Sequence, residues 1–317
     1  MVRIEIAKRT ERIYVGIKLY REPPLEHPDL IASWPGIGNI GLIAADILRG
    51  QLEAEELGEI EPWDFFYPKK VRIRDGELKD MEFPASTFYF KRTALRDIIV
   101  FLGEEQPSDD RGMYAEGKKA YKMANLVLDV AEHFGCRRIY TSGAAVAPVH
   151  HTMTPRVWAV PNTEKLISEI KTYRNTVLMS EIEGRDGQGM ITGLNGLLLG
   201  VARKRGIDAI CLMGEIPIYL EGSPFAYPKA SRSIINVLSA ALNIDIDCDQ
   251  TNRFVERSER EINDLYEKLP TEIKDQLDRL KHIGHDESKQ SEPITEDDKQ
   301  RILEDIDKLF KKGTKED

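Results

Sequence analysis

The chain has 317 residues, of which 41% are apolar and 31% are charged, and its net charge is −9. This length suits about two domains, or one large α/β unit with an appendage, and the acidic balance argues against a nucleic-acid partner, which needs a positive surface. No apolar run approaches the length of a membrane-spanning helix and residues 1–12 lack the apolar segment of a secretory signal, so we expect a cytoplasmic protein without a membrane partner.

The first half of the chain alternates β-branched runs with helical patterns. Strands are predicted at 13–19, 30–34, 97–102 and 138–142, and helices at 38–48 and 113–134. Between them, residues 71–91 resemble a β-hairpin, because Asp75 and Gly76 supply the positive φ angles of a tight turn. We expect this hairpin to form an antiparallel extension of the sheet.

The second half continues the alternation. Strands are predicted at 157–160, 176–179 and 209–213, and helices at 163–173, 191–204 and 231–242, with Thr163 placed to cap the helix that follows it. Strands that recur after helices need crossover connections, which make them parallel neighbours in one sheet. The predicted fold is therefore a three-layer α/β body with a mostly parallel sheet.

Charge divides the chain into two parts. Residues 250–317 hold 33 charged side chains in 68 positions, whereas residues 1–249 hold 66 in 249. We therefore expect an α/β domain over 1–249 and a charged, amphipathic helical tail over 250–317, with a flexible linker near 284–294. Pro270 predicts a kink or a break between two helices.

The apolar residues of the tail recur every three or four positions, so each helix has one apolar face. These faces must pack on the body, on each other or on another chain. The candidate interaction residues are Ile262, Leu265, Leu269, Ile273, Leu277, Ile306 and Phe310.

A glycine-rich turn is the most specific local motif. Gly36, Gly38 and Gly41 match the spacing of a dinucleotide-binding turn, and they follow a strand and precede a helix. The expected second strand ending in an acidic residue does not follow, because residues 51–62 lack an apolar β-branched run. The glycines therefore predict either a cofactor turn or, as we favour, a tight strand-to-helix connection. We predict no cofactor.

Other residues are candidates for lining the same edge of the sheet. Gly187 and Gly189 precede a helix and could offer their amides to an anion, although close packing explains these glycines as well. Glu104 and Glu105 follow a strand and could act in acid/base chemistry or be solvated. His150 is a further candidate for lining a pocket. No metal site is predicted, because the adjacent histidines lack partners at ligand spacing, and the three cysteines are too far apart for one.

Several motifs in order resemble one known family. They are Trp34-Pro35-Gly36-Ile37-Gly38-Asn39-Ile40-Gly41, Gly103-Glu104-Glu105-Gln106-Pro107, Ser142-Gly143-Ala144 with Pro148 and His150, Gly193-Leu194-Asn195-Gly196-Leu197-Leu198, and Glu215-Ile216-Pro217. Together, over roughly residues 10–245, they resemble the archaeal branch of the proteasome assembly chaperones, whose sequences have also been labelled ATP-grasp-like enzymes.

The resemblance implies a fold similar to purine nucleoside phosphorylases and a non-catalytic, homo-oligomeric chaperone or adaptor that binds proteasome α-subunits or other protein clients. Eukaryotic relatives dock through a C-terminal hydrophobic-tyrosine-any motif, whereas this chain ends Lys315-Glu316-Asp317. The alternative is a nucleotide- or nucleoside-binding enzyme or sensor that uses the Gly36–Gly41 turn.

Overall fold

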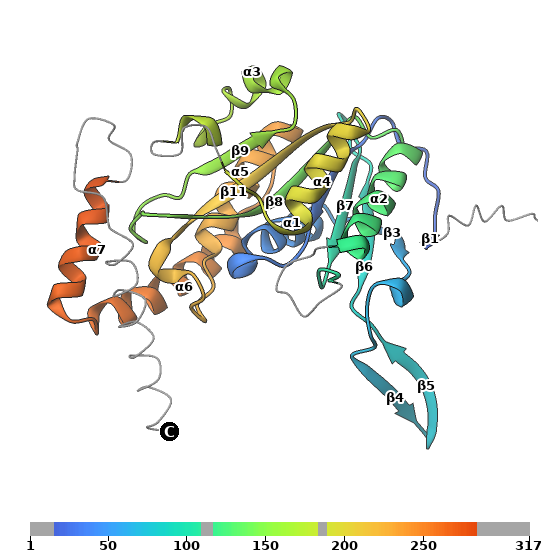
Figure 1. The fold of residues 1–317 in the computed structure, drawn as a ribbon, viewed down its shortest axis with the longest axis horizontal. Coiled ribbons are helices and arrows are strands. Elements are labelled where there is room, and N and C mark those ends of the chain that lie inside the picture. Colours follow the sequence, from blue (N-terminus) through green and yellow to red (C-terminus); the bar gives the residue numbers. More distant parts are fainter. Residues whose placement is uncertain (1–15, 109–116, 183–188, 284–317) are drawn as a thin grey trace, which may run out of the picture.

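A computed structural model describes residues 16–108, 117–182 and 189–283 (Figure 1). Most of its strands form one nine-stranded sheet. In sheet order, these strands are β1 (Ile17–Leu19), β3 (Glu55–Ile60), β6 (Ser86–Lys91), β7 (Ile98–Gly103), β2 (Asp29–Ser33), β8 (Arg138–Ala147), β11 (Asp208–Pro217), β9 (Val157–Pro161) and β10 (Thr176–Leu178).

The sheet is mixed. The four central strands β7, β2, β8 and β11 are parallel neighbours, whereas β6, β3 and β1 continue the sheet antiparallel on one side and β9 pairs antiparallel with β11 on the other. The prediction of a mostly parallel sheet is therefore wrong for the flanks. The crossover rule applies only where a long helix separates two strands, and β6, β7 and β9 follow short connections.

Helices cover both faces of the sheet, as expected for three layers. Their bounds are α1 (Ile40–Gln51), α2 (Gly117–His133), α3 (Ile167–Ile170), α4 (Gly193–Lys204), α5 (Pro228–Leu242), α6 (Asp249–Glu267) and α7 (Thr271–Ile283). One apolar core lies under α2 and α4, and the other under α1 and α5. Strand β2 serves both cores, because Leu30 and Ala32 face the first and Ile31 faces the second.

The predicted hairpin forms, but it does not extend the sheet. Strands β4 (Lys70–Arg74) and β5 (Glu77–Glu82) pair around a turn in which Asp75 and Gly76 have φ angles of 54° and 78°. They make a separate two-stranded sheet, which we call the ribbon (residues 70–82), and it projects away from the body in Figure 1. The remainder of the predicted hairpin is β6, an ordinary strand of the main sheet.

Two further local predictions are wrong. Strand β3 is absent from the prediction because half of its sequence, Glu-Glu-Leu-Gly-Glu-Ile, is acidic; only Leu57, Gly58 and Ile60 are buried, and Gly58 allows the backbone of Lys18 to approach. Residues 163–173 form a single short 3₁₀ turn and the four-residue α3 instead of a long helix, and the Thr163 side chain accepts no capping hydrogen bond.

The tail helices α6 and α7 pack on the body. They are separated at Pro270, as predicted, and α6 contacts α5. Ile262, Leu277 and Leu280 are buried in the same apolar core as residues of α1 and α5. The predicted linker near 284–294 and the helix carrying Ile306 and Phe310 lie outside the described residues.

All three cysteines are free thiols, and Cys211 is fully buried, where burial raises its pKa to about 11. Within the described residues, no helix has the length and hydropathy needed to cross a membrane. The same residues contain no group of three or more histidine, cysteine or acidic side chains that could hold a metal ion.

Candidate functional site

Two adjoining pockets lie at the carboxyl ends of the central parallel strands, where open α/β sheets bind ligands. The first, the acidic pocket, has a volume of about 550 Å³ and is lined by Pro35, Gly36, Ile37, Gly38, Glu104, Glu105, Gln106, Leu220, Glu221, Gly222 and Ser223. The second, the methionine pocket, has a volume of about 210 Å³ and shares Gly36, Ile37 and Gln106 with the first. The glycine turn therefore separates two cavities.

The three glycines of the turn have different roles. Gly36 is extended and has open space where a Cβ atom would be. Gly38 has a φ of 59°, in the left-handed region that favours glycine. Gly41 brings α1 against β8, because a Cβ atom there would lie 2.6 Å from the Gly143 nitrogen and closer still to the Ser142 oxygen. Gly36 and Gly38 line the acidic pocket, and Gly41 is a packing residue.

The strand after α1 is in the wrong place for a dinucleotide fold. In that fold the next strand lies parallel to the first and presents an acidic residue to the ribose. Here β3 runs in the same direction as β2 but is not its neighbour, because it pairs with β1 and β6 and lies three positions away from β2 in the sheet. The topology therefore supports the conformational interpretation of the glycine turn.

Glu104 and Glu105 both line the acidic pocket, and Lys69 forms an ion pair with each of them. Its ammonium group lies 3.2 Å from a carboxylate oxygen of each. The backbone amide of Ala85 donates a 3.1 Å hydrogen bond to Glu104, and together with Lys69 this holds the pKa of that carboxyl below its usual range. Glu104 therefore stays charged and both acids are paired with Lys69, which does not suit proton transfer. Because Lys69 directly precedes β4, the same contacts also fix the base of the ribbon.

Gln106 joins three segments at the boundary between the pockets. Its side-chain amide donates to the Pro35 oxygen at 2.5 Å, and its oxygen accepts from the Leu194 nitrogen at 2.9 Å. Gly193 makes this possible, because a Cβ atom there would lie 2.7 Å from the Gln106 oxygen. Gly196 likewise packs on Ile191. Close contacts therefore account for the glycines at positions 193 and 196.

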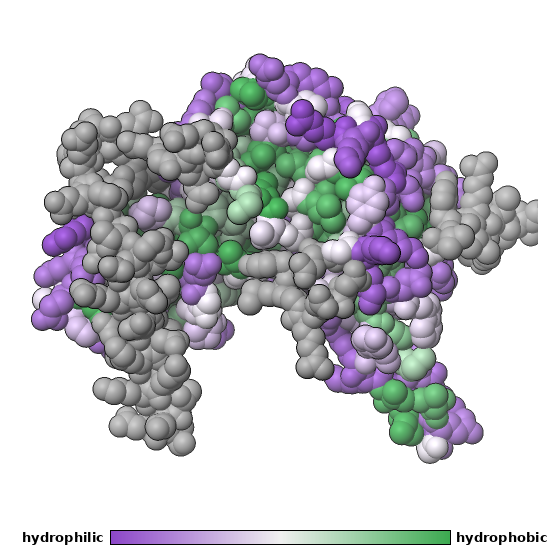
Figure 2. All heavy atoms as spheres, in the orientation of Figure 1, coloured by the Kyte–Doolittle hydropathy of each residue, from purple (hydrophilic) through white to green (hydrophobic). Residues whose placement is uncertain are grey.

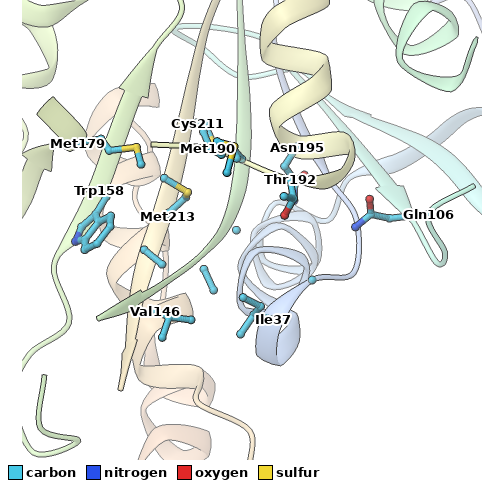
Figure 3. A pocket seen from close by; sticks show the side chains of 15 residues that line it. Ile37, Gln106, Val146, Trp158, Met179, Met190, Thr192, Asn195, Cys211 and Met213 are labelled. Carbon is cyan, nitrogen blue, oxygen red and sulfur yellow. The ribbon is translucent and has the colours of Figure 1, made fainter. Parts of the chain in front are cut away.

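Most of the side chains that line the methionine pocket are apolar, and its polar side chains are Gln106, Thr192 and Asn195. Figure 3 shows Trp158 and Met213 on one side of the cavity and Thr192 and Asn195 on the other. Asn195 is only 7% exposed, and its side-chain oxygen has no hydrogen-bond partner. An unpaired buried amide oxygen is costly, so this pocket suits a small apolar group that carries one hydrogen-bond donor. The site prediction missed Asn195, although it belongs to a motif of the family resemblance.

Glu215, from another of those motifs, is a buried structural carboxylate. Its oxygens accept hydrogen bonds from the Arg156 backbone at 2.7 Å, from the Arg156 guanidinium at 3.0 Å and from the Trp158 ring nitrogen at 2.8 Å. It thereby joins β11 to β9 and orients Trp158, which lines the methionine pocket.

His150 does not lie in either pocket. It stacks on His151 with a ring separation of 4.1 Å, and both are buried beneath the tail helices. His151 contacts the Tyr219 hydroxyl at 2.7 Å and the Asn263 side-chain oxygen of α6 at 2.9 Å. These residues form a histidine cluster that attaches the tail to the body. Sequence spacing could not reveal this, because the partners lie some 70 to 130 positions away.

Burial of the two histidines beneath the tail makes the packing of the tail sensitive to acid. Burial and the neighbouring His151 lower the pKa of His150 to about 3, and burial also lowers the pKa of His151. The ionisable groups that face the two rings come from α5, α6, α7 and the 3₁₀ turn Ile218–Leu220, and are Tyr219, Lys229, Glu259, Tyr266, Asp278 and Lys281. Between about pH 3 and pH 6.5, the His150 ring is therefore neutral in the folded chain and charged in the unfolded chain.

We predict that His150 contributes stability that is fully present above about pH 6.5 and is lost as the pH falls toward 3. Between about pH 7 and pH 5, the wild-type chain should lose about 2 kcal/mol more unfolding free energy than His150→Gln. Urea unfolding at the two pH values measures this difference. Equal losses in the two proteins would contradict the assignment.

The remaining predicted residues are dispersed. Gly189 is exposed near the methionine pocket, and Gly187 lies outside the described residues. Of the tail residues, Ile262, Leu269, Ile273 and Leu277 are buried in the chain's own core and Leu265 is half-buried.

Comparison with known proteins identifies the family. The sequence model of the PAC2 family matches residues 30–266. The uncharacterized protein MJ1210 of Methanocaldococcus jannaschii is 28% identical over 231 residues, covering 73% of this chain and 80% of that protein. The crystal structure of Pyrococcus furiosus PbaB, an archaeal proteasome activator, is 27% identical, covers 78% of this chain and 97% of PbaB, and superimposes with a TM-score of 0.65.

Two more distant structures share the fold. Pyrococcus furiosus PbaA, an archaeal homolog of proteasome-assembly chaperone, is 19% identical, with coverage of 84% of this chain and 99% of PbaA and a TM-score of 0.57. The Mycobacterium tuberculosis proteasome-assembly chaperone homologue Rv2125 is 18% identical, with coverage of 80% and 99% and a TM-score of 0.61. On the match over three quarters of its length, this chain belongs to the PAC2 family.

Proposed function

We propose that this protein is a non-catalytic, homo-oligomeric assembly chaperone or adaptor of the cytoplasm, which binds proteasome α-subunits or other protein clients. The observation that carries this proposal is the 27% identity to an archaeal proteasome activator over 97% of that protein. The site geometry agrees, because Glu104 and Glu105 are paired with Lys69 and His150 is sealed beneath the tail.

A client must contact a surface other than the apolar faces of α6 and α7, which are buried against the body. Ile262 and Leu277 are already buried against the body, so their removal would expose the core. Residues 284–317, which include Ile306 and Phe310, can be removed without taking any residue from α6 or α7.

Capture of purified α-subunits by the immobilised full-length chain tests the proposal. We expect saturable capture that is lost in a chain ending at residue 283 and in full-length Ile306→Asp/Phe310→Asp. Full-length Leu95→Asp, which changes an exposed leucine outside the tail, is the matched control and should capture normally. Capture by the shortened chain would exclude the tail contact, and no capture by the full-length chain would contradict the function.

A second function is favoured by the unpaired Asn195 oxygen in the methionine pocket. In this alternative the chain is a sensor or enzyme for a nucleoside or nucleotide, held beside the Gly36–Gly41 turn. Isothermal titration with adenosine, ATP and NAD should then give micromolar binding that Asn195→Ala and Gly38→Arg abolish. Binding weaker than about millimolar would exclude this alternative.

A further inference from the structure

The ribbon exposes apolar side chains on one of its two faces. The register pairs Val71 with Met81 and Ile73 with Leu78. A β-bulge, in which Lys79 has no partner on β4, brings both pairs onto the same face. These side chains are 52%, 37%, 67% and 65% exposed, respectively. Figure 2 shows this hydrophobic group on the projecting ribbon, away from the body.

Exposed apolar groups are concentrated in this part of the described structure. Six of the eleven large exposed hydrophobic residues in the described ranges lie between 63 and 81, including Trp63 and Tyr67 just before β4. Scattered apolar residues are ordinary on a surface, but a contiguous patch marks an interaction site. A two-stranded sheet alone is also marginally stable in water, so the ribbon gains stability from a partner.

Charge on the other face limits the kind of partner. The register places Lys70 opposite Glu82, Arg72 opposite Asp80, and Arg74 opposite Glu77, so each basic group of β4 has an acidic neighbour on β5. Residues 70–82 carry four basic and four acidic side chains, whereas the whole chain has a charge of −9. The ribbon is therefore a neutral surface on which two acidic copies can meet with little repulsion.

The distribution of charge between the strands also selects an arrangement. All charges on β4 are basic, and those on β5 are acidic except for Lys79. Edge-to-edge pairing of β4 with β4, or β5 with β5, would align like charges, which is unfavourable. A two-fold axis along the ribbon instead places the apolar faces together and sets β4 of one copy over β5 of the other. At each edge of the paired ribbons, the basic strand of one copy then lies over the acidic strand of the other.

We propose that the ribbon is a self-association surface, on which a second copy of this chain packs its own ribbon face to face. This inference rests on the homo-oligomeric state proposed above and names the surface that makes it. Lys69, held by Glu104 and Glu105, fixes the ribbon to the edge of the sheet at which the central parallel strands end. The contact between two ribbons would therefore hold the acidic pockets of two copies at a defined separation.

Sedimentation velocity of the full-length chain tests this proposal. The wild-type protein should sediment as a dimer or a multiple of one, and Ile73→Asp/Leu78→Asp should weaken association at least about tenfold, because it buries charge in an apolar contact. Leu95→Asp is the matched control, since Leu95 is 71% exposed and lies outside the ribbon, and it should keep the wild-type mass.

Hydrogen exchange provides a second measurement on the same proteins. Amides of residues 70–82 should be protected in the wild-type assembly and exchange rapidly in the double variant, while core amides remain protected in both. A monomeric wild-type chain would contradict the oligomer and the ribbon contact together. A double variant that keeps the wild-type mass would contradict the ribbon contact alone, even if it lost binding to α-subunits.

Discussion

Replacing Gly41 with alanine should destabilise the protein by about 3 kcal/mol or more. A Cβ atom at this position would overlap the backbone of Ser142 and Gly143 in β8, and neither strand nor helix can move without disturbing its neighbours. The carbonyl of Gly41 also accepts a 3.0 Å hydrogen bond from the Ser142 hydroxyl, which fixes the separation of α1 from β8. Urea unfolding monitored by circular dichroism measures the change.

Gly50→Ala is the matched control for this prediction. Gly50 lies in the same helix, and a Cβ atom there would meet open space. Because alanine favours a helix over glycine, we expect this variant to be unchanged or stabilised by up to about 1 kcal/mol. If the two variants had equal stability, the close approach of α1 to β8 would not be a structural requirement.

Replacing Leu277 with alanine should cost roughly 2–5 kcal/mol, although this residue lies in the charged tail. Its side chain is fully buried in the core that also contains α1 and α5, and its removal leaves a cavity. The same urea experiment measures the loss. Leu95→Ala, which changes an exposed leucine, should stay within about 0.5 kcal/mol of the wild-type protein. A small loss for Leu277→Ala would show that α7 does not belong to the core.

The high charge of the tail is therefore a property of the outer faces of α6 and α7 and not of their inner faces. Their inner faces meet the histidine cluster, where Asn263 and Asp278 lie near His151 and His150. The sequence periodicity correctly identified an apolar face and the break at Pro270. It could not identify what covers that face, because periodicity contains no information about distant segments.

Local rules predicted the turns well and the sheet less well. Asp75–Gly76 and the glycine turn are determined by backbone angles that few residues adopt, so they are visible in sequence. Strand β3 is not, because its acidic residues are tolerated only through antiparallel pairing with β1 and β6. The direction of a flanking strand depends on connection length and partner choice, which no local pattern specifies.

The site was predicted in part. Gly36, Gly38, Glu104 and Glu105 do meet in the acidic pocket, because they follow neighbouring parallel strands. Their chemistry was not predictable, since Lys69 reaches them from a segment 35 positions away. The methionine pocket was missed because most of its lining comes from β8, β9, β11 and the start of α4, and its polar side chains, Gln106, Thr192 and Asn195, come from two separate segments.

We propose that this chain works by binding proteasome α-subunits. Sedimentation velocity of the purified full-length protein mixed with fluorescently labelled α-subunits tests this proposal. We expect a faster-moving complex that contains the label, with a dissociation constant in the micromolar range or tighter. Labelled α-subunits that sediment at an unchanged rate at every concentration of this protein would contradict it.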